Sequence, residues 1–267
     1  METGSTTLSI SQEYDPIIVL PGRAFKNRIP GAYPDLPTKE KAKNNISILH
    51  ACKLLKCYYS NEPSINALVL DGKKMRTTHT LTRLGDKLNN ITIVEYNNAT
   101  YEKMLYAKKL NPKIQIYNCH IKEYIDNLNN SYTNVVYFDI MSTFFTSDKS
   151  YGSDIIINKF LKDSLCSEIV LAATFCLRNS LSQSHQIQQK RIMILLQKIF
   201  EVNGFKYKSL ISDKNLRYKG QNTGNRSMMF VLFFLFKDKD KDDKDDKDDV
   251  ITKKYEDNNK DRYIDLY

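Results

Sequence analysis

The stretch NALVLDGKKMRTTHTL, residues 66–81, contains an apolar run that ends at an Asp-Gly pair and leads into a helix-like segment. Four apolar residues in a row, 67–70, are typical of a strand that is buried on both faces. Asp71 and Gly72 form a turn signal, and two threonines follow with hydroxyls that suit a helix start. A buried strand, a turn and a helix predict the first βα unit of a parallel sheet.

The same alternation continues along the chain. The strand-like runs, including the one already described, cover residues 65–70, 91–96, 113–117, 134–139 and 168–174. Helical patterns begin at residue 38 and lie near 77–89, 99–110, 121–129, 153–165 and 184–203. This order predicts right-handed βαβ crossovers and a parallel sheet covered on both faces. The last two runs, 204–211 and 227–236, have only a polar loop between them, so we expect an antiparallel hairpin.

Three segments differ in composition. Residues 1–37 are polar and punctuated by proline and glycine, which is typical of a loop extension. Residues 38–236 hold the strand and helix patterns and form one predicted domain. Residues 237–267 begin with the low-complexity run KDKDKDDKDDKDD and contain few core-forming residues. We therefore expect this tail to be disordered.

The body of the chain is strongly basic. The formal net charge of the whole chain is +9, residues 237–249 contribute −3 and residues 250–267 contribute nothing, so residues 1–236 carry +12. Such a body attracts polyanions, with nucleic acid first and an anionic membrane or an acidic protein next. The alternative is a composition imposed by an AT-rich genome, whose codons favour Lys, Asn, Ile and Tyr.

Cysteine usage and hydropathy predict an intracellular, non-membrane protein. The five cysteines are scattered and form no C-x-x-C pair, which fits reduced thiols in the cytoplasm or nucleus and argues against a zinc site. The N-terminus shows no signal-sequence pattern. The longest apolar run, 228–236, is too short to cross a bilayer, so we expect a buried strand there and no membrane partner.

Five βα units followed by an antiparallel hairpin resemble the seven-stranded fold of class I S-adenosylmethionine (SAM)-dependent methyltransferases, over residues 65–236. The resemblance implies an α/β fold with a mostly parallel, doubly wound sheet and SAM as the cofactor. In such sheets ligands bind outside the carboxyl ends of the strands. The family's first turn is rich in glycine, whereas here Gly72 is followed by Lys74 and Met75 near the places of the other glycines.

The resemblance assigns cofactor contacts to the ends of the first two strands. Asp71 and Gly72 form the first turn, where backbone N–H groups approach the cofactor. Glu95 ends the second strand, 24 residues after Asp71, at a spacing where a carboxylate can accept both ribose hydroxyl protons. Tyr96 would lie against the adenine or the ribose. A solvated glutamate at a strand end remains the alternative.

The third and fourth strands supply the remaining candidates. In YNCHIKEYI, residues 117–125, the residues Cys119, His120 and Ile121 would contact the adenine. A histidine in such a loop is more often a satisfied loop residue than a catalyst, so His120 is taken as a ligand contact only. Asp139 ends the fourth strand and is the candidate catalytic residue. It would either orient the nucleophile or hold a helix N-terminus.

Basic and aromatic residues follow the last helix. Between residues 206 and 226 the chain carries six Lys or Arg against a single Asp. The candidate substrate contacts are Lys214, Arg217, Tyr218 and Lys219. Lys and Arg neutralise phosphates and exposed Tyr stacks on unpaired bases, whereas the alternative is a solvated basic face.

Together these patterns predict a SAM-dependent methyltransferase acting on RNA or DNA. The alternative is a catalytically inactive methyltransferase-like module that serves as a binding or scaffold protein. An NAD enzyme of the Rossmann type is disfavoured, because the G-x-G-x-x-G fingerprint is absent.

Overall fold

The computed structural model describes residues 39–58, 65–128, 131–140, 144, 152–177, 184–212, 217–219 and 227–237. The predicted extension 1–37 and residues 238–267 of the predicted tail lie outside the described residues, so the expectations about them stay predictions. Lys237, assigned above to the tail, is instead the last residue of a strand, where its N–H donates to the Ser167 carbonyl at 2.8 Å.

Eight strands among the described residues form one sheet in the order β3-β2-β1-β4-β5-β8-β6, with β7 paired to β8. Their bounds are β1 Ile65–Val69, β2 Leu88–Val94, β3 Ile114–Tyr117, β4 Val135–Asp139, β5 Glu168–Leu177, β6 Phe205–Ser209, β7 Arg217–Lys219 and β8 Ser227–Lys237. Strands β1 to β5 are parallel, and β8 runs antiparallel to β5, β6 and β7. The predicted seven-stranded layout with its closing antiparallel strands is confirmed.

The short strand β7 corrects one expectation, because the sequence predicted only a loop between the last two strands. Strand β8 is longer than β6, which pairs with residues 233–237 of β8. The other end of the same edge of β8, residues 227–229, pairs with β7. Pairing there satisfies backbone groups that β6 does not reach.

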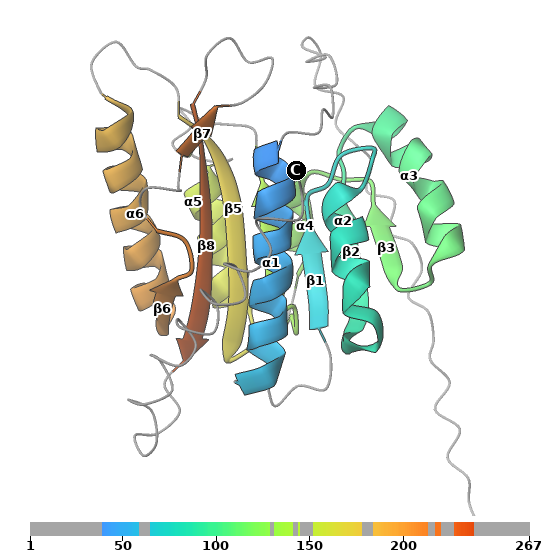
Figure 1. The fold of residues 1–267 in the computed structure, drawn as a ribbon, viewed down its shortest axis with the longest axis horizontal. Helices are drawn as coiled ribbons and strands as arrows, with labels where there is room; N and C mark the ends of the chain where they lie inside the picture. The colour runs from blue at the N-terminus through green and yellow to red at the C-terminus, as the bar shows by residue number, and fades with distance from the viewer. Residues whose placement is uncertain are drawn as a thin grey trace, which may run out of the picture.

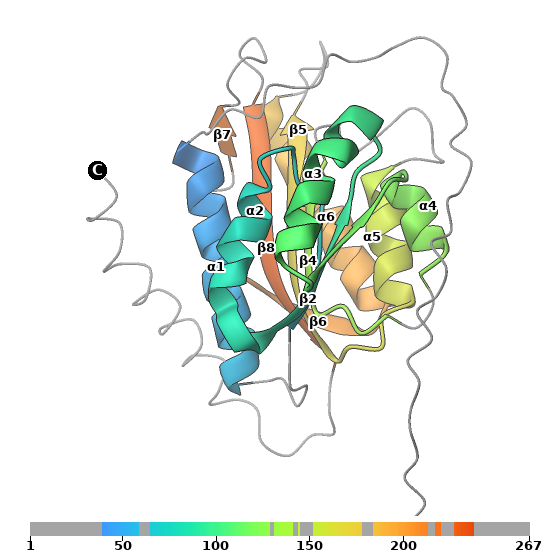
Figure 2. The ribbon, with the colours of Figure 1, turned by 90° about the vertical axis from the view of Figure 1, so that its right-hand side faces the viewer.

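Helices cover both faces of the sheet. Their bounds are α1 Lys39–Tyr58, α2 Arg76–Leu81, the 3₁₀ helix η1 Thr82–Lys87, α3 Asn98–Leu110, α4 Ile121–Asp126, α5 Ser153–Lys162 and α6 His185–Val202. Helices α1, α2 and α3 lie on one face, and α4, α5 and α6 lie on the other (Figures 1 and 2). The single helix expected over 77–89 is wrong in its second half: Gly85, at φ 61°, breaks it, and β2 already begins at Leu88.

Alternating strand residues build a separate core on each face. In β4, Val135 and Tyr137 belong to the core under α1, whereas Val136 and Phe138 belong to the core under α5 and α6. Burial on both faces explains the continuous apolar runs in the sequence. Among the described residues, no helix combines the length and apolar character that a bilayer crossing requires.

Candidate functional site

The candidate site lies at the edge of the sheet where the parallel strands have their carboxyl ends. Strand order reverses between β1 and β4, which are neighbours in the sheet. A reversal of this kind opens a crevice for ligands between the two strand ends. Asp71 follows β1 and Asp139 ends β4, so the structure brings these two predicted residues to the same end of the sheet, close enough for the charge of Asp139 to raise the pKa of Asp71.

Asp71 connects the turn after β1 to helix α2. Its Oδ2 accepts a hydrogen bond from the backbone N–H of Thr78 at 2.8 Å, and its Oδ1 accepts one from the N–H of Gly72 at 3.2 Å. Burial raises the pKa of Asp71 to about 6, the negative charge of Asp139 adds to this effect, and the Thr78 N–H opposes it. Asp71 therefore fixes the shape of the turn, and its carboxyl group holds a proton to a higher pH than an ordinary aspartate does.

The glycine-poor turn contains a strained residue. Met75 has φ 47° and ψ 43°, the left-handed conformation that glycine adopts most easily. Its N–H donates to the Gly72 carbonyl at 2.7 Å. The Met75 side chain is only 3% exposed and belongs to the core under α1. The turn thus reaches a glycine-like conformation with a methionine whose side chain packs inside the protein.

Glu95, Tyr96 and His120 come together at the ends of β2 and β3. The Glu95 carboxylate accepts a hydrogen bond from the Asn97 N–H at 2.6 Å, and burial raises its pKa. Tyr96 is 64% exposed, and its ring lies 6.3 Å from the His120 ring at an angle of 54°. Two rings beside a partly buried carboxylate form a suitable rim for a planar base joined to a sugar.

The other residues predicted after β3 have clear structural roles. His120 is the N-cap of α4: its Nδ1 accepts from the Lys122 N–H at 3.2 Å, and its own N–H donates to Glu123 Oε2 at 3.3 Å. Burial lowers the pKa of His120, which favours the neutral ring that such a cap needs. Burial and the Glu123 charge raise the pKa of Cys119 to about 11, so its thiol stays protonated. Ile121 is buried.

Asp139 forms an ion pair that the sequence analysis missed. Lys41 Nζ, in the first turn of α1, lies 2.9 Å from Asp139 Oδ2, and the two side chains are 26% and 17% exposed. The other oxygen, Oδ1, is buried without a hydrogen-bond partner among the described residues. No sequence signal could have found Lys41, because it lies 98 positions from Asp139.

The predicted substrate residues are only partly described. Lys214 lies outside the described residues, whereas Arg217, Tyr218 and Lys219 form β7. Arg217 is opposite Met229 of β8, and Met229 is opposite Phe175 of β5. Phe175 directly follows the residue that pairs with Asp139. Strand β7 therefore lies at the same end of the sheet as the candidate site (Figure 1).

Comparisons with known proteins find solved structures of similar fold but no similar sequence. No family model and no curated protein matches the sequence. A probable spermidine synthase from Corynebacterium glutamicum aligns with a TM-score of 0.50 and 9% identity over 78% of this chain and 70% of its own. TYW2 from M. jannaschii in complex with AdoMet has a TM-score of 0.48 and 13% identity over 76% of this chain and 78% of its own.

TYW2 from P. horikoshii in complex with MeSAdo has a TM-score of 0.49 and 9% identity over 76% of this chain. The match covers 65% of that protein, which is less than two thirds of its length. The strand order and the spermidine synthase alignment together define the fold as class I methyltransferase-like. At these identities the likeness concerns the fold alone.

Proposed function

We propose that this protein is a SAM-dependent methyltransferase that acts on nucleic acid. One observation carries the proposal: three carboxylates, Asp71, Glu95 and Asp139, follow or end the adjacent strands β1, β2 and β4 at the carboxyl edge of the sheet. An adenosine-type ligand uses a carboxylate at the end of the second strand, and the strand reversal beside it leaves room for the rest of the molecule.

The residues at the end of β2 and β3 suit the nucleoside half of SAM. Glu95 would accept the ribose hydroxyl protons, and Tyr96 and His120, whose rings neighbour each other, would contact the adenine or the ribose. Asp71 would act indirectly by holding the turn. Bound SAM supplies the methyl group, whose transfer is an in-line displacement that depends on orientation more than on acid–base strength.

Asp139 suits the acceptor side of the site. Lys41 holds one carboxylate oxygen, and the buried second oxygen lacks a partner among the described residues. A buried acceptor without a partner carries a desolvation cost that a donor from a ligand would remove. Asp139 Oδ1 would therefore accept a hydrogen bond from the target N–H or O–H group and aim its lone pair at the methyl group.

The nucleic-acid target rests on charge and on the position of β7. Residues 1–236 carry a net charge of +12 in the sequence. Two of the three residues of β7 are basic, and this strand lies at the edge of the sheet that carries the candidate site. Cationic residues beside the site would neutralise backbone phosphates of a bound strand.

A second candidate is a methyltransferase-like module that binds without transferring a methyl group. Two observations favour it: Met75 replaces a glycine in the first turn, and Lys41 already engages Asp139. The two candidates differ in turnover, so a binding measurement followed by a transfer measurement separates them.

Isothermal titration with SAM tests the cofactor assignment. Glu95→Ala should weaken SAM binding by about 1–3 kcal/mol, roughly 5- to 150-fold, through loss of charge-assisted hydrogen bonds. Glu102→Ala, which removes an exposed carboxylate on α3, is the matched control and should bind like the wild type. Equal affinity in the Glu95 variant would remove Glu95 from the site, and binding of NAD in place of SAM would overturn the proposal.

Transfer of a labelled methyl group from SAM to separate RNA, DNA and protein pools tests the reaction. Incorporation into RNA or DNA, lost in Asp139→Asn, is the expected result. Binding of SAM without incorporation into any pool would favour the non-catalytic module. Incorporation into protein alone would contradict the nucleic-acid target.

A further inference from the structure

The inner side of helix α1 changes from apolar to polar as the helix approaches the candidate site. Ile48 and Cys52, in its middle turns, belong to the core under α1. Lys41, Asn44 and Asn45 occupy the same side of the helix in its first turns, because they are three to four positions from one another and from Ile48. The N-terminal end of α1 lies at the edge of the sheet toward which β1 points (Figure 1). The polar part of α1 is therefore the part next to the site.

Asn44 lies on the side of Lys41 that faces away from α2. Successive residues of a helix are about 100° apart, so Lys41 lies between Asn45 and Asn44 around α1. Asn45 accepts a hydrogen bond from Thr77 of α2. Lys41 contacts Asp139 at the end of β4. Because α2 follows β1 and the sheet continues through β4 to β5, which α1 also contacts, Asn44 lies on the β4 and β5 side.

Two buried polar atoms in this neighbourhood, Asn44 Nδ2 and Asp139 Oδ1, have no hydrogen-bond partner among the described residues. The amide nitrogen can only donate, and a carboxylate oxygen can only accept. Lys41 contacts the other oxygen of Asp139, and residues three apart on a helix have Cβ atoms about 5–6 Å apart. The two unpaired atoms therefore belong to neighbouring side chains, and a ligand that supplies both partners would remove their desolvation cost.

The described strand neighbours of Asp139 do not complete this pair. Thr174 is opposite Asp139 in β5, and its hydroxyl lies 3.1 Å from the hydroxyl of Tyr137. Cys176 follows two positions later on the same face of β5 and is opposite Met228 of β8. Thiol and thioether groups are weak hydrogen-bonding partners. A ligand with a donor and an acceptor side by side would satisfy both unpaired atoms.

A donor beside an acceptor selects one class of target. Unpaired adenine and cytosine carry an exocyclic amino group next to a ring nitrogen that accepts hydrogen bonds. A phosphate offers acceptors alone, and a protonated lysine side chain offers donors alone. A ribose hydroxyl would have to engage both side chains through a single oxygen atom, whereas a base edge offers two atoms. The pair of unpaired atoms therefore matches the edge of an amino-bearing base.

We propose that Asn44 and Asp139 read the edge of an unpaired adenine or cytosine whose amino group receives the methyl group. This inference rests on the proposed function and names the target of the same site. The amino group donates to Asp139 Oδ1, and Asn44 Nδ2 donates to the ring nitrogen, so Asn44 determines specificity. The amino nitrogen bonds the methyl carbon, the carbon–sulfur bond breaks with its electron pair left on sulfur, and the nitrogen releases one proton to water.

Methyl transfer to oligonucleotides with a single target base tests the proposal. The full chain is first titrated with SAM and then given labelled SAM with single-stranded oligouridine or oligothymidine that carries one central adenine, cytosine or guanine. Adenine or cytosine should be methylated on the amino group at least about tenfold faster than guanine, uracil or thymine. A complementary strand should slow transfer at least about tenfold, because base pairing occupies both atoms of the edge.

A cycle that combines a variant with a modified base isolates the contact of Asn44. Asn44→Leu removes the donor and should lower kcat/KM roughly 5- to 150-fold, while SAM affinity stays within about twofold. A deaza base, in which C–H replaces the ring nitrogen, removes the acceptor. Its penalty should be smaller in Asn44→Leu than in the wild type by that same factor, because the contact is already absent. A purely structural role of Asn44 would leave the two penalties equal.

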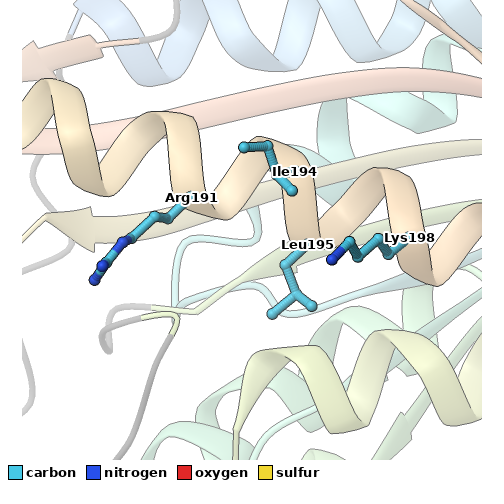
Figure 3. A pocket seen from close by; sticks show the side chains of 4 residues that line it. All are labelled: Arg191, Ile194, Leu195 and Lys198. Carbon is cyan, nitrogen blue, oxygen red and sulfur yellow. The ribbon is translucent and has the colours of Figure 1, made fainter.

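A matched control removes an amide elsewhere. Gln197→Leu changes a partly buried residue of α6, next to Lys198 (Figure 3), on the opposite face of the sheet. This variant should keep the wild-type kcat/KM and the wild-type penalty for the deaza base. Circular dichroism checks that each variant is folded, and the deaza base tests the wild type directly should Asn44→Leu fail to fold.

The outcomes separate this inference from the proposed function. A wild type that does not bind SAM would overturn both. SAM binding with methylation of guanine, uracil, thymine, ribose or protein, or with no transfer to adenine or cytosine, would overturn the base assignment while the cofactor assignment stands. A deaza penalty that is the same in wild type and Asn44→Leu would remove Asn44 from the recognition of the base.

Discussion

At the scale of single residues, the turn after β1 places a carboxylate and a strained backbone side by side. Asp71 accepts backbone hydrogen bonds, but its burial, with a smaller effect from the charge of Asp139, raises its pKa to about 6. Met75 holds a conformation that non-glycine residues adopt at a cost of roughly 1–2 kcal/mol. Both features lower the free energy of unfolding at a place where a ligand would bind. Such strain is common where a turn is shaped for a ligand.

Asp71→Asn tests the first feature. Because the folded-state pKa lies above the ordinary 3.8, the folded protein holds this proton more tightly, and its stability falls as pH rises from about 4 to 6. The Asp71→Asn variant should not lose stability over this pH range, and its amide oxygen can still accept the hydrogen bond from the Thr78 N–H. Relative to wild type, it should gain about 1–3 kcal/mol between pH 4 and pH 7 in urea unfolding. Asp86→Asn, at an exposed position, is the control, and parallel pH curves for the Asp71 variant and wild type would contradict the assignment.

Substitution of Met75 separates strain from burial. Met75→Ala and Met75→Gly remove nearly the same buried side chain, so both should be destabilised by about 2–4 kcal/mol. Only glycine relieves the left-handed backbone, and Met75→Gly should therefore be about 1 kcal/mol more stable than Met75→Ala. Chemical denaturation of the pair measures this difference, and an alanine variant equal to or better than glycine would show that the residue is unstrained.

At the scale of elements, helix α1 contacts β4 and α2 beside the candidate site, although its residues are distant from both in the sequence. Lys41 pairs with Asp139 of β4, and the Thr77 hydroxyl of α2 donates to Asn45 Oδ1 at 3.2 Å. Both contacts are polar and at least partly buried, so each element depends on the other for satisfied partners. Helix α1 therefore contacts both β4 and α2 beside the candidate site, as well as covering the core.

A double-mutant cycle with Lys41→Met and Asp139→Asn measures this link. The coupling energy should be about 1–3 kcal/mol, and Lys41→Met alone should cost the most, because it leaves a partly buried carboxylate without its cation. The exposed i, i+4 pair Lys122–Asp126 on α4 is the matched control and should give about 0.3–0.5 kcal/mol. Equal coupling energies in the two cycles would show that the Lys41–Asp139 pair stabilises the packing of α1 no more than an exposed ion pair would.

At the scale of the whole molecule, the topology places β7 at the end of the sheet where the candidate site lies. Strand β8 runs antiparallel to β5, and β7 pairs with the part of β8 that lies beside the carboxyl ends of the parallel strands. A basic strand next to the site would act with the net charge of the body to attract and hold a phosphate backbone.

Neutralising Lys214, Arg217 and Lys219 together tests the substrate side. The affinity for single-stranded RNA or DNA should fall, and its dependence on salt should become less steep, because about three phosphate contacts would no longer release counterions. SAM affinity should stay unchanged, since these residues follow the strands that carry the cofactor candidates. Anisotropy titrations from about 50 to 200 mM salt measure both effects. A triple variant that keeps the wild-type affinity and slope would exclude this surface as the binding site.

The sequence by itself determined the alternation of strands and helices, the antiparallel closing strands and the strand ends that carry Asp71, Glu95 and Asp139. These features follow from hydrophobic periodicity and from short-range turn chemistry, both of which are local. Residues 67–69 and 228–235 became buried strand residues as expected, whereas Leu70 follows β1 and is, like Phe236, only partly buried.

Only the tertiary structure decided the features that depend on distant partners. Lys41 meets Asp139 across 98 positions, β7 forms because β8 extends beyond β6, and Met75 adopts its conformation because the core under α1 takes its side chain. Such contacts depend on the packing of the whole chain, so no local sequence pattern predicts them.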